Sequence, residues 1–326
     1  MKLVQAQKID SFDDYEIVDG EVPVPGPDEV LIKVAACGMG YVDALLALGG
    51  YQVKPQLPFT PGQETGGIVE AVGADVAGLK PGDRVMAATF GGGLAEYIAV
   101  PQASVFAIPD TMSFAQAAIF RINYLTAIHG LVDRAAIRGG EKLLVFGSAG
   151  GVGLAAVQIA TLLGAQVIAA ASSEAKRTVA TSHGAHSVID TEPDGWRDRL
   201  KERTGGKGPD VIFDPVCGPL FEPAFRSLAW RGRHLVVGFA GGPFPSLPVN
   251  LPLMKGASLT GVDIRQFLLY EDTRGREHLD TLLGWVGEGK LEPVVGRRFP
   301  VADHREAMAF AMSGQAHGKT VIEFFQ

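Results

Sequence analysis

The sequence has few of the residues that build disulfide frameworks or metal clusters. Among its 326 residues there are two cysteines, Cys37 and Cys217, which lie far apart and form no C-x-x-C pair. The seven histidines show no metal-ligand spacing. His183 and His186 are close together, but no third candidate ligand lies near them in the sequence. These shortages exclude a disulfide-rich secreted scaffold and a zinc-finger module.

Long apolar segments and an excess of basic residues are also missing. No run of eighteen or more apolar residues is present, and the first ten residues, MKLVQAQKID, contain no apolar core of a signal peptide. The formal net charge is −7, whereas nucleic acids and anionic membranes require a basic face. We therefore expect a cytoplasmic protein that acts on a small-molecule substrate, without nucleic acid or membrane as a partner.

Glycine and proline, in contrast, are abundant. The 42 glycines and 20 prolines suit a structure rich in turns. In the first 110 residues, short β-like runs end at glycine or proline, and one helical stretch, 42–50, interrupts them. The expected strands are 30–38, 66–73, 81–88, 95–101 and 104–109. This pattern predicts a small, partly open β-barrel.

The pattern changes from about residue 114, where Ser113 is a candidate N-cap. Nearly continuous apolar strands then alternate with helices, beginning with the strand KLLVFG at 142–147 and ending with ASLTGVD at 257–263. Such alternation is typical of a doubly wound parallel sheet covered on both faces. We expect this domain to span residues 119–264, between a first domain of 1–118 and a segment of 265–326 that folds back onto the first.

The stretch 143–160, LLVFGSAGGVGLAAVQIA, places Gly147, Gly150 and Gly153 between an expected strand and helix. The strict G-x-G-x-x-G fingerprint would have glycine at 148, where Ser148 stands. Its physical requirements are still met, because Gly150 lets the backbone approach a pyrophosphate and Gly153 lets helix and strand pack closely. The helix N-terminus also favours phosphate. We predict a dinucleotide site rather than a purely structural turn, with the cofactor contacted by Ser148, Ala149, Gly150, Gly151 and Val152.

The end of the next expected strand indicates which dinucleotide binds. An NAD-dependent enzyme usually has an acid there for the ribose 2′-hydroxyl, but residues 169–177 read AAASSEAKR. The hydroxyls of Ser172 and Ser173 and the cations of Lys176 and Arg177 suit a 2′-phosphate. Glu174 adds one opposing charge. We predict NADPH as the cofactor; the alternative is that the serines cap a solvated helix.

The chain resembles the medium-chain dehydrogenase/reductase superfamily, and within it the zinc-free quinone oxidoreductase branch that includes the ζ-crystallin-like proteins. The motifs that carry the resemblance are CGMGYVDALLALGGYQVKPQLPFTPGQETGGIV (37–69), KPGDRV (80–85), GSAGGVGLAAVQIA (147–160), GPDVIFDPV (208–216) and WRGRHLVVGFA (230–240). It covers essentially the whole chain. It implies a GroES-like catalytic domain with an inserted Rossmann domain, a homodimer, and NADPH-dependent reduction of quinones or activated C=C bonds.

The resemblance also bears on metal binding. Zinc members of the superfamily hold the metal with a cysteine, a histidine and a second cysteine or acid. Cys37 matches the first ligand, but Gln63 stands where the histidine would be, and the third position falls near Ile122 or Asn123. A catalytic zinc needs three protein ligands. We therefore expect no metal. The alternative roles are a buried, apolar Cys37 and a hydrogen-bonded loop at Gln63 and Glu64.

Three residues are candidates for the acceptor site. Tyr41 and Tyr51 flank the short helix after Cys37, in a region that lines the substrate cleft of the family, so either hydroxyl can bind the acceptor oxygen or supply a proton. Arg121 stands where relatives are commonly apolar, and it can bind an anionic group of the substrate. The alternatives are ordinary packing for the tyrosines and a surface or interface charge for Arg121. Gly40 replaces an asparagine that the family often has.

The remaining cofactor candidates follow from the resemblance. Thr126 matches a residue near the nicotinamide, and Asn123 is its neighbour. Val237, Gly238 and Phe239 end a strand where the backbone of relatives meets the nicotinamide, with core and turn roles as the alternative. Asp190 replaces a frequent tyrosine and would repel a 2′-phosphate if it pointed inward.

The predicted function is an NADPH-dependent, zinc-independent oxidoreductase of quinones, enones, enals or enoyl thioesters. Without zinc, a simple aldehyde lacks its Lewis acid, whereas a conjugated acceptor spreads the charge over its own atoms. The alternative is a protein that binds NADPH without catalysis, as a redox sensor or a structural protein.

Overall fold

A computed structural model of the chain describes residues 1–324, and the elements given below belong to this range. The chain forms two compact units. Unit 1 comprises Met1–Ile122 and the residues from Leu283 onward, and unit 2 comprises Asn123–Leu282. Unit 2 is thus inserted into the sequence of unit 1. No helix of residues 1–324 has the length and apolarity to span a bilayer.

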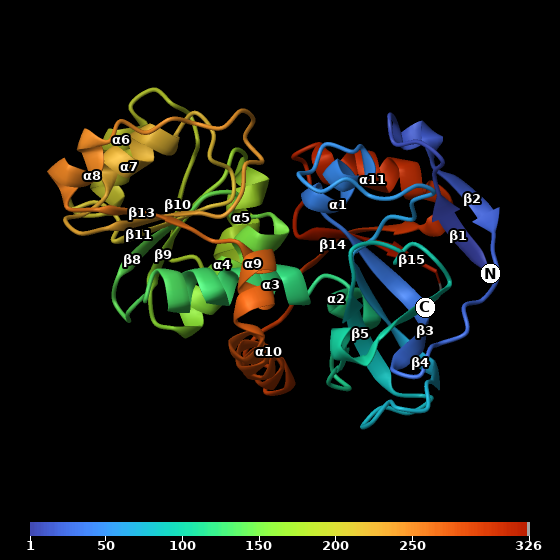
Figure 1. Cartoon of the computed structure of the whole chain (residues 1–326). Coiled ribbons are helices and arrows are strands. Elements are labelled where there is room, and N and C mark those ends of the chain that lie inside the picture. The colour runs from blue at the N-terminus through green and yellow to red at the C-terminus, as the bar shows by residue number, and fades with distance from the viewer. Residues whose placement is uncertain (325–326) are drawn as a thin grey trace. The chain divides into compact units, whose positions relative to one another are not determined.

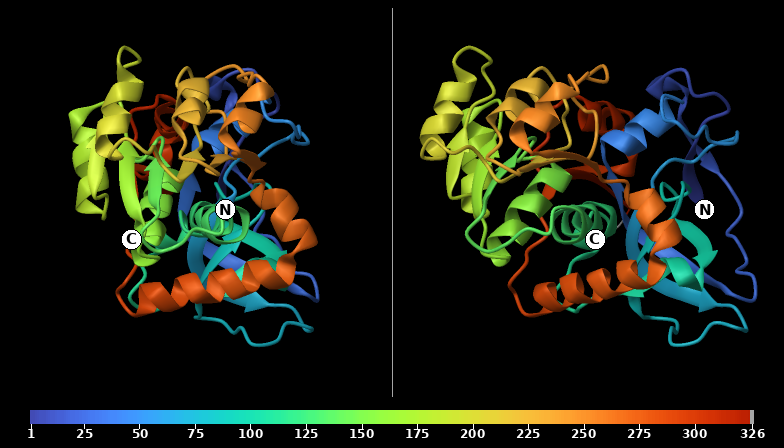
Figure 2. Two further views of the ribbon diagram at one scale, coloured as in Figure 1. Left: turned by 90° about the vertical axis from the view of Figure 1, so that its left-hand side faces the viewer. Right: turned by 60° about the vertical axis from the view of Figure 1, so that its left-hand side comes forward.

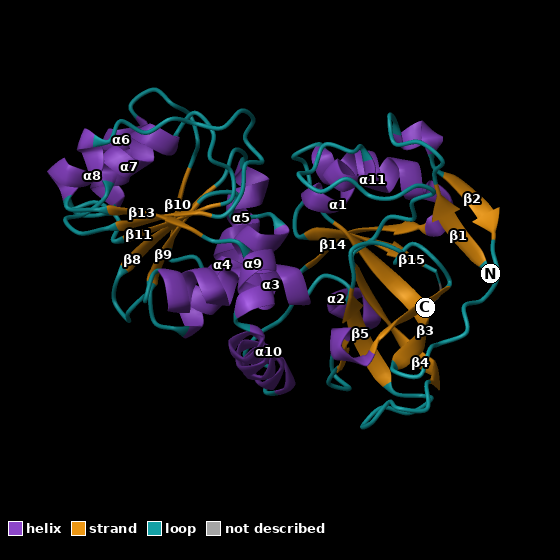
Figure 3. Cartoon of the chain, in the orientation of Figure 1, coloured by secondary structure: helices purple, strands orange, loops and turns teal. Residues whose placement is uncertain are grey.

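Unit 1 is mainly a seven-stranded sheet in the order β14-β15-β3-β4-β5-β7, with β6 also paired to β3. Figure 3 labels β14, β15, β3, β4 and β5 of this sheet. Only β14 and β15 pair in parallel. A separate antiparallel pair, β1 and β2, completes its β structure. Its elements are β1 (Lys2–Gln5), η1 (Phe12–Asp14), β2 (Glu16–Asp19), β3 (Glu29–Met39), α1 (Tyr41–Ala47), β4 (Glu64–Val72), β5 (Arg84–Ala88), β6 (Tyr97–Pro101), η2 (Gln102–Ser104), β7 (Val105–Ala107), α2 (Phe114–Ala117), β14 (Val295–Pro300), η4 (Val301–Asp303), α11 (His304–Met312) and β15 (Lys319–Glu323).

Strand β3 is the centre of this unit. One of its edges pairs with β4, and the other pairs first with β6 and then with β15. Both of its faces are buried, since successive side chains point to opposite sides of a sheet. Val30 and Ile32 pack into one apolar cluster, whereas Cys37 and Met39 belong to another. The sheet therefore carries Cys37 into the interior of the unit.

Unit 2 is a six-stranded parallel sheet in the order β10-β9-β8-β11-β12-β13. This is the 3-2-1-4-5-6 order of a dinucleotide-binding sheet, so the doubly wound prediction is confirmed. Its elements are η3 (His129–Arg134), β8 (Lys142–Val145), α4 (Gly151–Leu162), β9 (Gln166–Ala170), α5 (Glu174–Ser182), β10 (Ser187–Ile189), α6 (Trp196–Arg203), β11 (Val211–Asp214), α7 (Phe221–Ser227), β12 (Arg233–Val236), α8 (Asn250–Lys255), β13 (Ser258–Gly261) and α9 (Ile264–Tyr270).

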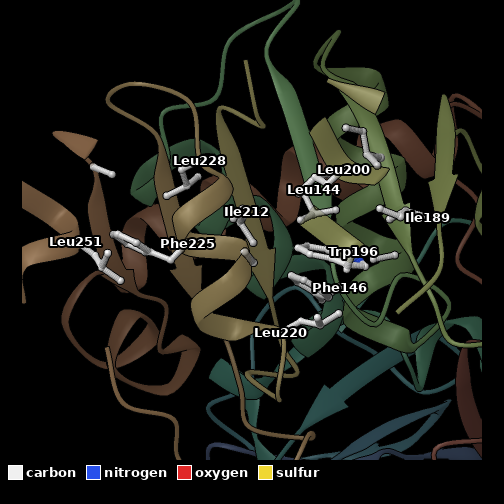
Figure 4. Close-up of a cluster of buried hydrophobic side chains, with 14 residues drawn as sticks. Leu144, Phe146, Ile189, Trp196, Leu200, Ile212, Leu220, Phe225, Leu228 and Leu251 are labelled. Carbon is white, nitrogen blue, oxygen red and sulfur yellow. The ribbon is translucent and has the colours of Figure 1, made fainter. Parts of the chain in front are cut away.

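An apolar core fills the space between this sheet and helices α6, α7 and α8, which lie together on one face (Figures 1 and 4). Leu144 and Ile212 point from the strands toward Trp196 and Phe225 of the helices. Trp196 Nε1 donates a hydrogen bond to Asp190 O at 2.9 Å, so burial of the indole leaves no unpaired donor. The near-continuous apolar strands of the sequence are explained by this packing.

The chain crosses between the units inside two helices, α3 (Arg121–Ile128) and α10 (Asp272–Gly287), the long orange helix of Figure 2. Within unit 2, Asp133 just beyond α3 accepts hydrogen bonds from His278 and Arg274 of α10, at 2.7 and 3.2 Å. His129 stacks on Phe267 of α9, with the ring centroids 3.9 Å apart.

These contacts explain where the division of the chain falls. The boundaries expected from the sequence were 118/119 and 264/265, whereas contacts divide the chain at 122/123 and 282/283. The sequence placed α10 and all of α9 except its first residue in the returning segment. The structure groups α9, and α10 as far as Leu282, with the parallel sheet.

Candidate functional site

The glycine-rich turn connects β8 to α4 in unit 2. Gly147 has φ +56°, a left-handed conformation that favours glycine. A Cβ added to Gly153 would lie 2.1 Å from Gly147 O, so helix and strand can pack this closely only with glycine there. A Cβ on Gly150 would meet only Gly147 O, at 3.3 Å, so the outer side of this turn is open. The close approach at Gly153 agrees with the packing role predicted for it, whereas the approach of a pyrophosphate to Gly150 stays a prediction.

The other turn residues have mixed environments. Ser148 is buried, and its hydroxyl donates to Ala170 O at 3.0 Å, so the side chain ties the turn to β9. Ala149 is buried as well. Gly150 is the N-cap of α4, and Gly151 and Val152 are its first residues. The first N–H groups of a helix have no partner within it and are what the turn offers to a phosphate.

At the end of β9, Ser173 caps α5 and accepts a hydrogen bond from Lys176 N at 3.3 Å. Arg177 donates to Ala171 O at 3.0 Å, which holds its guanidinium beside the strand end. Ser172 is exposed and Lys176 is half-buried. Ser173 thus caps α5, as one interpretation of the sequence expects, and the cations Lys176 and Arg177 follow it in the same helix.

Asp190 follows β10 and forms an ion pair with Arg199, with Oδ1 and Nη2 2.7 Å apart. The same oxygen accepts a hydrogen bond from Glu192 N. The carboxylate is thus compensated by a cation of its own unit. This removes the main objection that Asp190 raised against a 2′-phosphate.

The candidates for the nicotinamide end lie on α3 and after β12. Thr126 is buried and Asn123 is half-buried. Val237 donates its N–H to Asp214 O at 3.0 Å, and a Cβ on Gly238 would lie 3.1 Å from Pro215 O. Phe239 is partly exposed and contacts Phe244 edge-on. Asn123 and Thr126 thus belong to α3, whereas Val237, Gly238 and Phe239 directly follow β12.

Asp214, at the end of β11, and His234, in the neighbouring β12, form a buried pair that the sequence did not reveal. Asp214 Oδ2 lies 3.1 Å from His234 Nε2, and its other oxygen accepts N–H groups from Val216 and Cys217. Cys217 has φ +46°, unusual for a residue with a side chain. Burial, with the nearby Asp214 carboxylate, raises the pKa of the Cys217 thiol, so it is protonated and serves packing.

In unit 1, Cys37 is fully buried, and burial raises the pKa of its thiol well above the ordinary value. A Cβ on Gly62 would lie 2.4 Å from Cys37 Sγ, so the PGQET loop packs directly on the sulfur. Gln63 N donates to Asp43 Oδ1 at 3.1 Å, and Thr89 N donates to Gln63 O at 2.8 Å. The loop is therefore fixed by its backbone.

Three charged side chains are buried next to this loop. Lys319 Nζ lies 2.6 Å from Glu64 Oε2 and 3.4 Å from Asp43 Oδ2. Asp43 also accepts Gly40 N at 2.8 Å, and Glu64 accepts Ile122 N at 2.7 Å. Burial acts to lower the pKa of Lys319, but the two carboxylates outweigh it and leave that pKa raised. Sequence reasoning missed Lys319 and Asp43; a lysine opening the apolar run KTVIEF was the only available signal.

The donor set around Cys37 does not fit a zinc ion. In place of a histidine the loop has Gln63, and the nearest carboxylates already bind Lys319 and backbone N–H groups. Across residues 1–324, no three His, Cys, Asp or Glu side chains are grouped so that they could hold a metal. A catalytic zinc site needs three protein ligands and an open position.

The three acceptor-site candidates all belong to unit 1 but have separate surroundings. Tyr41 is the first residue of α1 and half-buried, and Tyr51 packs against the apolar cluster that contains Leu46 and Phe59. The Arg121 guanidinium lies over the Phe106 ring, 5.1 Å from its centroid. The role of Arg121 in binding an anionic group stays a prediction, and so does the alternative of a surface or interface charge.

One shallow pocket of unit 1, about 380 Å³, lies between two loops and contains none of these three candidates. Its lining residues are Pro55, Gln56, Pro58, Phe59, Thr60, Phe90, Gly91 and Gly92.

Comparison with known proteins follows the division into two units. The family model of the alcohol dehydrogenase GroES-like domain matches residues 26–110, and that of the zinc-binding dehydrogenase domain matches 151–280. Quinone oxidoreductase-like protein 2 of Rattus norvegicus is 37% identical over 298 residues, 91% of this chain and 85% of that protein.

Two solved structures are similar over nearly their whole length. Escherichia coli quinone oxidoreductase complexed with NADPH is 26% identical with a TM-score of 0.91, covering 99% of this chain and 100% of that one. The CurK enoyl reductase is 26% identical with a TM-score of 0.89, covering 99% and 98%. The chain therefore belongs to the medium-chain dehydrogenase/reductase superfamily and to its quinone oxidoreductase branch, with the GroES-like and Rossmann-type folds that its motifs predicted.

Proposed function

We propose that this protein is an NADPH-dependent oxidoreductase that transfers hydride to a quinone or to an activated C=C bond. The observation that carries the proposal is the Gly147–Gly150–Gly153 turn. It places an open helix N-terminus at the carboxyl end of a strand, where a doubly wound sheet binds its ligand. The E. coli relative of this fold was solved with NADPH.

The choice of NADPH over NADH rests on charge. Lys176 and Arg177 follow the β9 end, where an acid would stand for NAD. Of the two acids that the sequence places near this region, Asp190 is paired with Arg199, and Glu174 is exposed in the first turn of α5. A 2′-phosphate would thus meet two cations and the hydroxyls of Ser172 and Ser173, against the single opposing charge of Glu174.

Zinc independence is part of the proposal, although one matching family model is named for zinc binding. The side chains at this position support zinc independence, because Gln63 and the buried thiol of Cys37 do not supply the three protein ligands that a catalytic zinc needs. NADPH, when bound, supplies the hydride. A conjugated acceptor needs only a hydrogen-bond donor for the oxygen that becomes negative. We assign this donor role to Tyr41 or Tyr51, and the binding of an anionic acceptor group to Arg121.

The nicotinamide end of the cofactor is assigned to Asn123, Thr126 and the strand end at Val237, Gly238 and Phe239. Thr126 is fixed by burial, whereas Phe239 is partly exposed. These residues orient the ring rather than react with it.

We further propose a homodimer. β13 is an edge strand whose outer side pairs with no strand of residues 1–324, and such an edge can pair with a second copy. Exposed apolar side chains gather on β13 and the neighbouring α8, where Leu259 is 44% and Leu253 82% exposed. The cytoplasm is the proposed location, because its reducing conditions suit a chain with two free thiols.

The test is NADPH oxidation with product identification, using a benzoquinone and a short enoyl-CoA after EDTA treatment. Saturated thioester formed with one NADPH per product would define an alkene reductase. Turnover of quinone alone would define a quinone reductase. Activity lost with EDTA and restored by zinc would overturn the zinc-independent mechanism.

The same assay addresses the alternative of an NADPH-binding protein without catalysis. Gly40, where relatives often have asparagine, removes one polar group next to α1 and favours that alternative. Tight NADPH binding with no turnover of either acceptor would establish it and reject the proposed reaction.

A further inference from the structure

Helix α3 begins at Arg121 without a typical N-cap residue before it. The residues that precede Arg121 are Ile119 and Phe120, and neither apolar side chain can accept a hydrogen bond. The first N–H groups of a helix need an acceptor from outside it when water is excluded. Glu64, which is 58 positions earlier on β4, provides one, because its Oε1 accepts the Ile122 N–H at 2.7 Å.

Glu64 is itself held in place. It is 1% exposed, and its second oxygen receives the Lys319 ammonium at 2.6 Å. Lys319 is 6% exposed and comes from β15, in the returning segment of unit 1. A carboxylate in this position gains from the positive end of the helix dipole, and the lysine offsets the cost of burying it.

Asp43 is the third buried charge next to Lys319, but it does not bind the N-terminus of α3. It accepts the N–H groups of Gly40 and Gln63, so it fixes the loop immediately before Glu64. Adjacent residues of the PGQET loop are thus used differently: Gln63 is held by its backbone, while the Glu64 side chain holds the helix.

We propose that Glu64 is a positioning residue for the reacting end of the cofactor, acting by capping α3 from β4 with Lys319 as its counter-ion. The next residue after Ile122 is Asn123, and Thr126 follows one turn later. Both are assigned to the nicotinamide end, so this inference rests on the proposed function. A fixed first turn sets the backbone from which both side chains project.

Two double variants separate the cap from the ion pair. Glu64→Gln with Lys319→Met removes both charges but keeps an amide oxygen that can accept the Ile122 N–H. Glu64→Leu with Lys319→Met removes the charges and the acceptor. Both lack the ion pair, so a difference between them reports the cap alone.

The first readout is hydrogen exchange at the Ile122 amide. We expect it to be about tenfold faster in the Leu/Met variant than in the Gln/Met variant, as for loss of one hydrogen bond. The second readout is binding of NADPH and of 2′,5′-ADP, which carries only the adenosine end. We expect NADPH to bind about tenfold more weakly to the Leu/Met variant, with 2′,5′-ADP binding the same in both.

Equal exchange at Ile122 in the two variants would overturn the cap. Faster exchange with unchanged NADPH binding and kcat would overturn the positioning role and leave Glu64 as a structural residue. If the wild-type protein reduces no acceptor but the NADPH difference persists, the proposed reaction fails and the positioning role stands. Should the double variants not fold, Glu64→Asp provides the same readouts, since it keeps the charge and shortens the reach to Ile122.

Discussion

Arg199 neutralises Asp190 through an ion pair of 2.7 Å, although nine positions separate them and Asp190 follows a strand of the nucleotide-binding sheet. The sequence alone presented Asp190 as an unfavourable charge near the expected 2′-phosphate. With Asp190 paired, Lys176 and Arg177 are the cations proposed to recognise the 2′-phosphate. Arg177 donates to Ala171 O, so replacing it would also disturb the end of β9, and Lys176 is the residue changed here.

Lys176→Ala is expected to raise the Kd for NADPH about tenfold or more, because a charge-assisted hydrogen bond contributes roughly 1.5–3 kcal/mol. The Kd for NADH should hardly change, since NADH has no 2′-phosphate. Calorimetry with both nucleotides measures this. Lys201→Ala, an exposed lysine on α6, is the matched control. An equal loss of affinity for both nucleotides would contradict recognition of the phosphate.

Gly153→Ala should disrupt unit 2, because the new Cβ would lie 2.1 Å from Gly147 O. We expect a loss of about 3 kcal/mol in unfolding free energy, the upper range for overpacking a well-packed site. Gly150→Ala is the control, since its Cβ meets nothing closer than 3.3 Å. It should keep the fold and weaken NADPH binding. Thermal unfolding and nucleotide titration of both variants distinguish packing from ligand approach.

Acid should weaken the contacts that hold α10 to the end of α3. Burial lowers the pKa of His129 from its ordinary 6.5, although the hydrogen bond that His129 donates to Asp133 acts in the opposite direction. As the pH falls below about 6.5, His129 is therefore protonated in the unfolded chain before it is protonated in the folded one. The unfolding free energy then falls by at most about 1.4 kcal/mol per pH unit for this one proton.

Asp133 acts in the same direction at lower pH. Burial tends to raise its pKa, but hydrogen bonds from His129 and His278 outweigh this and leave the pKa lowered from 3.8. Asp133 therefore contributes fully to folding stability at pH values above its ordinary pKa. This contribution is lost as the pH falls through the lowered pKa of the folded state. In His129→Gln, unfolding curves between pH 7 and 5 should show a shallower slope than wild type. An unchanged slope would show that His129 does not carry the effect.

Arg121→Ala tests two roles with one pair of substrates. If Arg121 binds an anionic group, the KM for enoyl-CoA should rise about tenfold while the KM for a neutral benzoquinone stays the same. If the contact with Phe106 is its only role, both substrates should respond alike. Arg121→Lys keeps the charge and loses the flat guanidinium, so it separates charge from stacking.

Replacing Leu253 and Leu259 with lysine should separate a homodimer formed through β13. Both side chains are exposed, so the fold should tolerate the change. Light scattering coupled to gel filtration would give the mass of each form. If the wild-type protein has the mass of a monomer, the dimer proposal is wrong. If the variant with both lysines still has the mass of a dimer, the interface does not involve β13.

Most elements of the fold could be predicted from the sequence where a short sequence pattern determines the local structure. Buried parallel strands gave apolar runs, and glycines marked the turn before α4. β14 was missed, because VGRRFP carries two exposed arginines and lies at the edge of the sheet, next to β15. The first turns of α10, which begins at Asp272, are held by Asp133, which is far away in sequence, so no local pattern marks this contact.

The site was harder to predict than the fold for a related reason. Residues within one motif, such as Ser173 and Lys176, could be paired from their spacing alone. Glu64 and Lys319 are 255 positions apart, so their contact depends on β15 joining the same sheet as β4 through β3. No local pattern encodes that pairing.

The two crossings between the units run through α3 and α10, not through loops. A protease that needs an extended, exposed segment would find none at 122/123 or 282/283, where the backbone is helical. Excising the nucleotide-binding unit as a separate fragment would cut both helices within their hydrogen-bonded turns. Both crossings are therefore helical, and a fragment that stops at either boundary would begin or end in mid-helix.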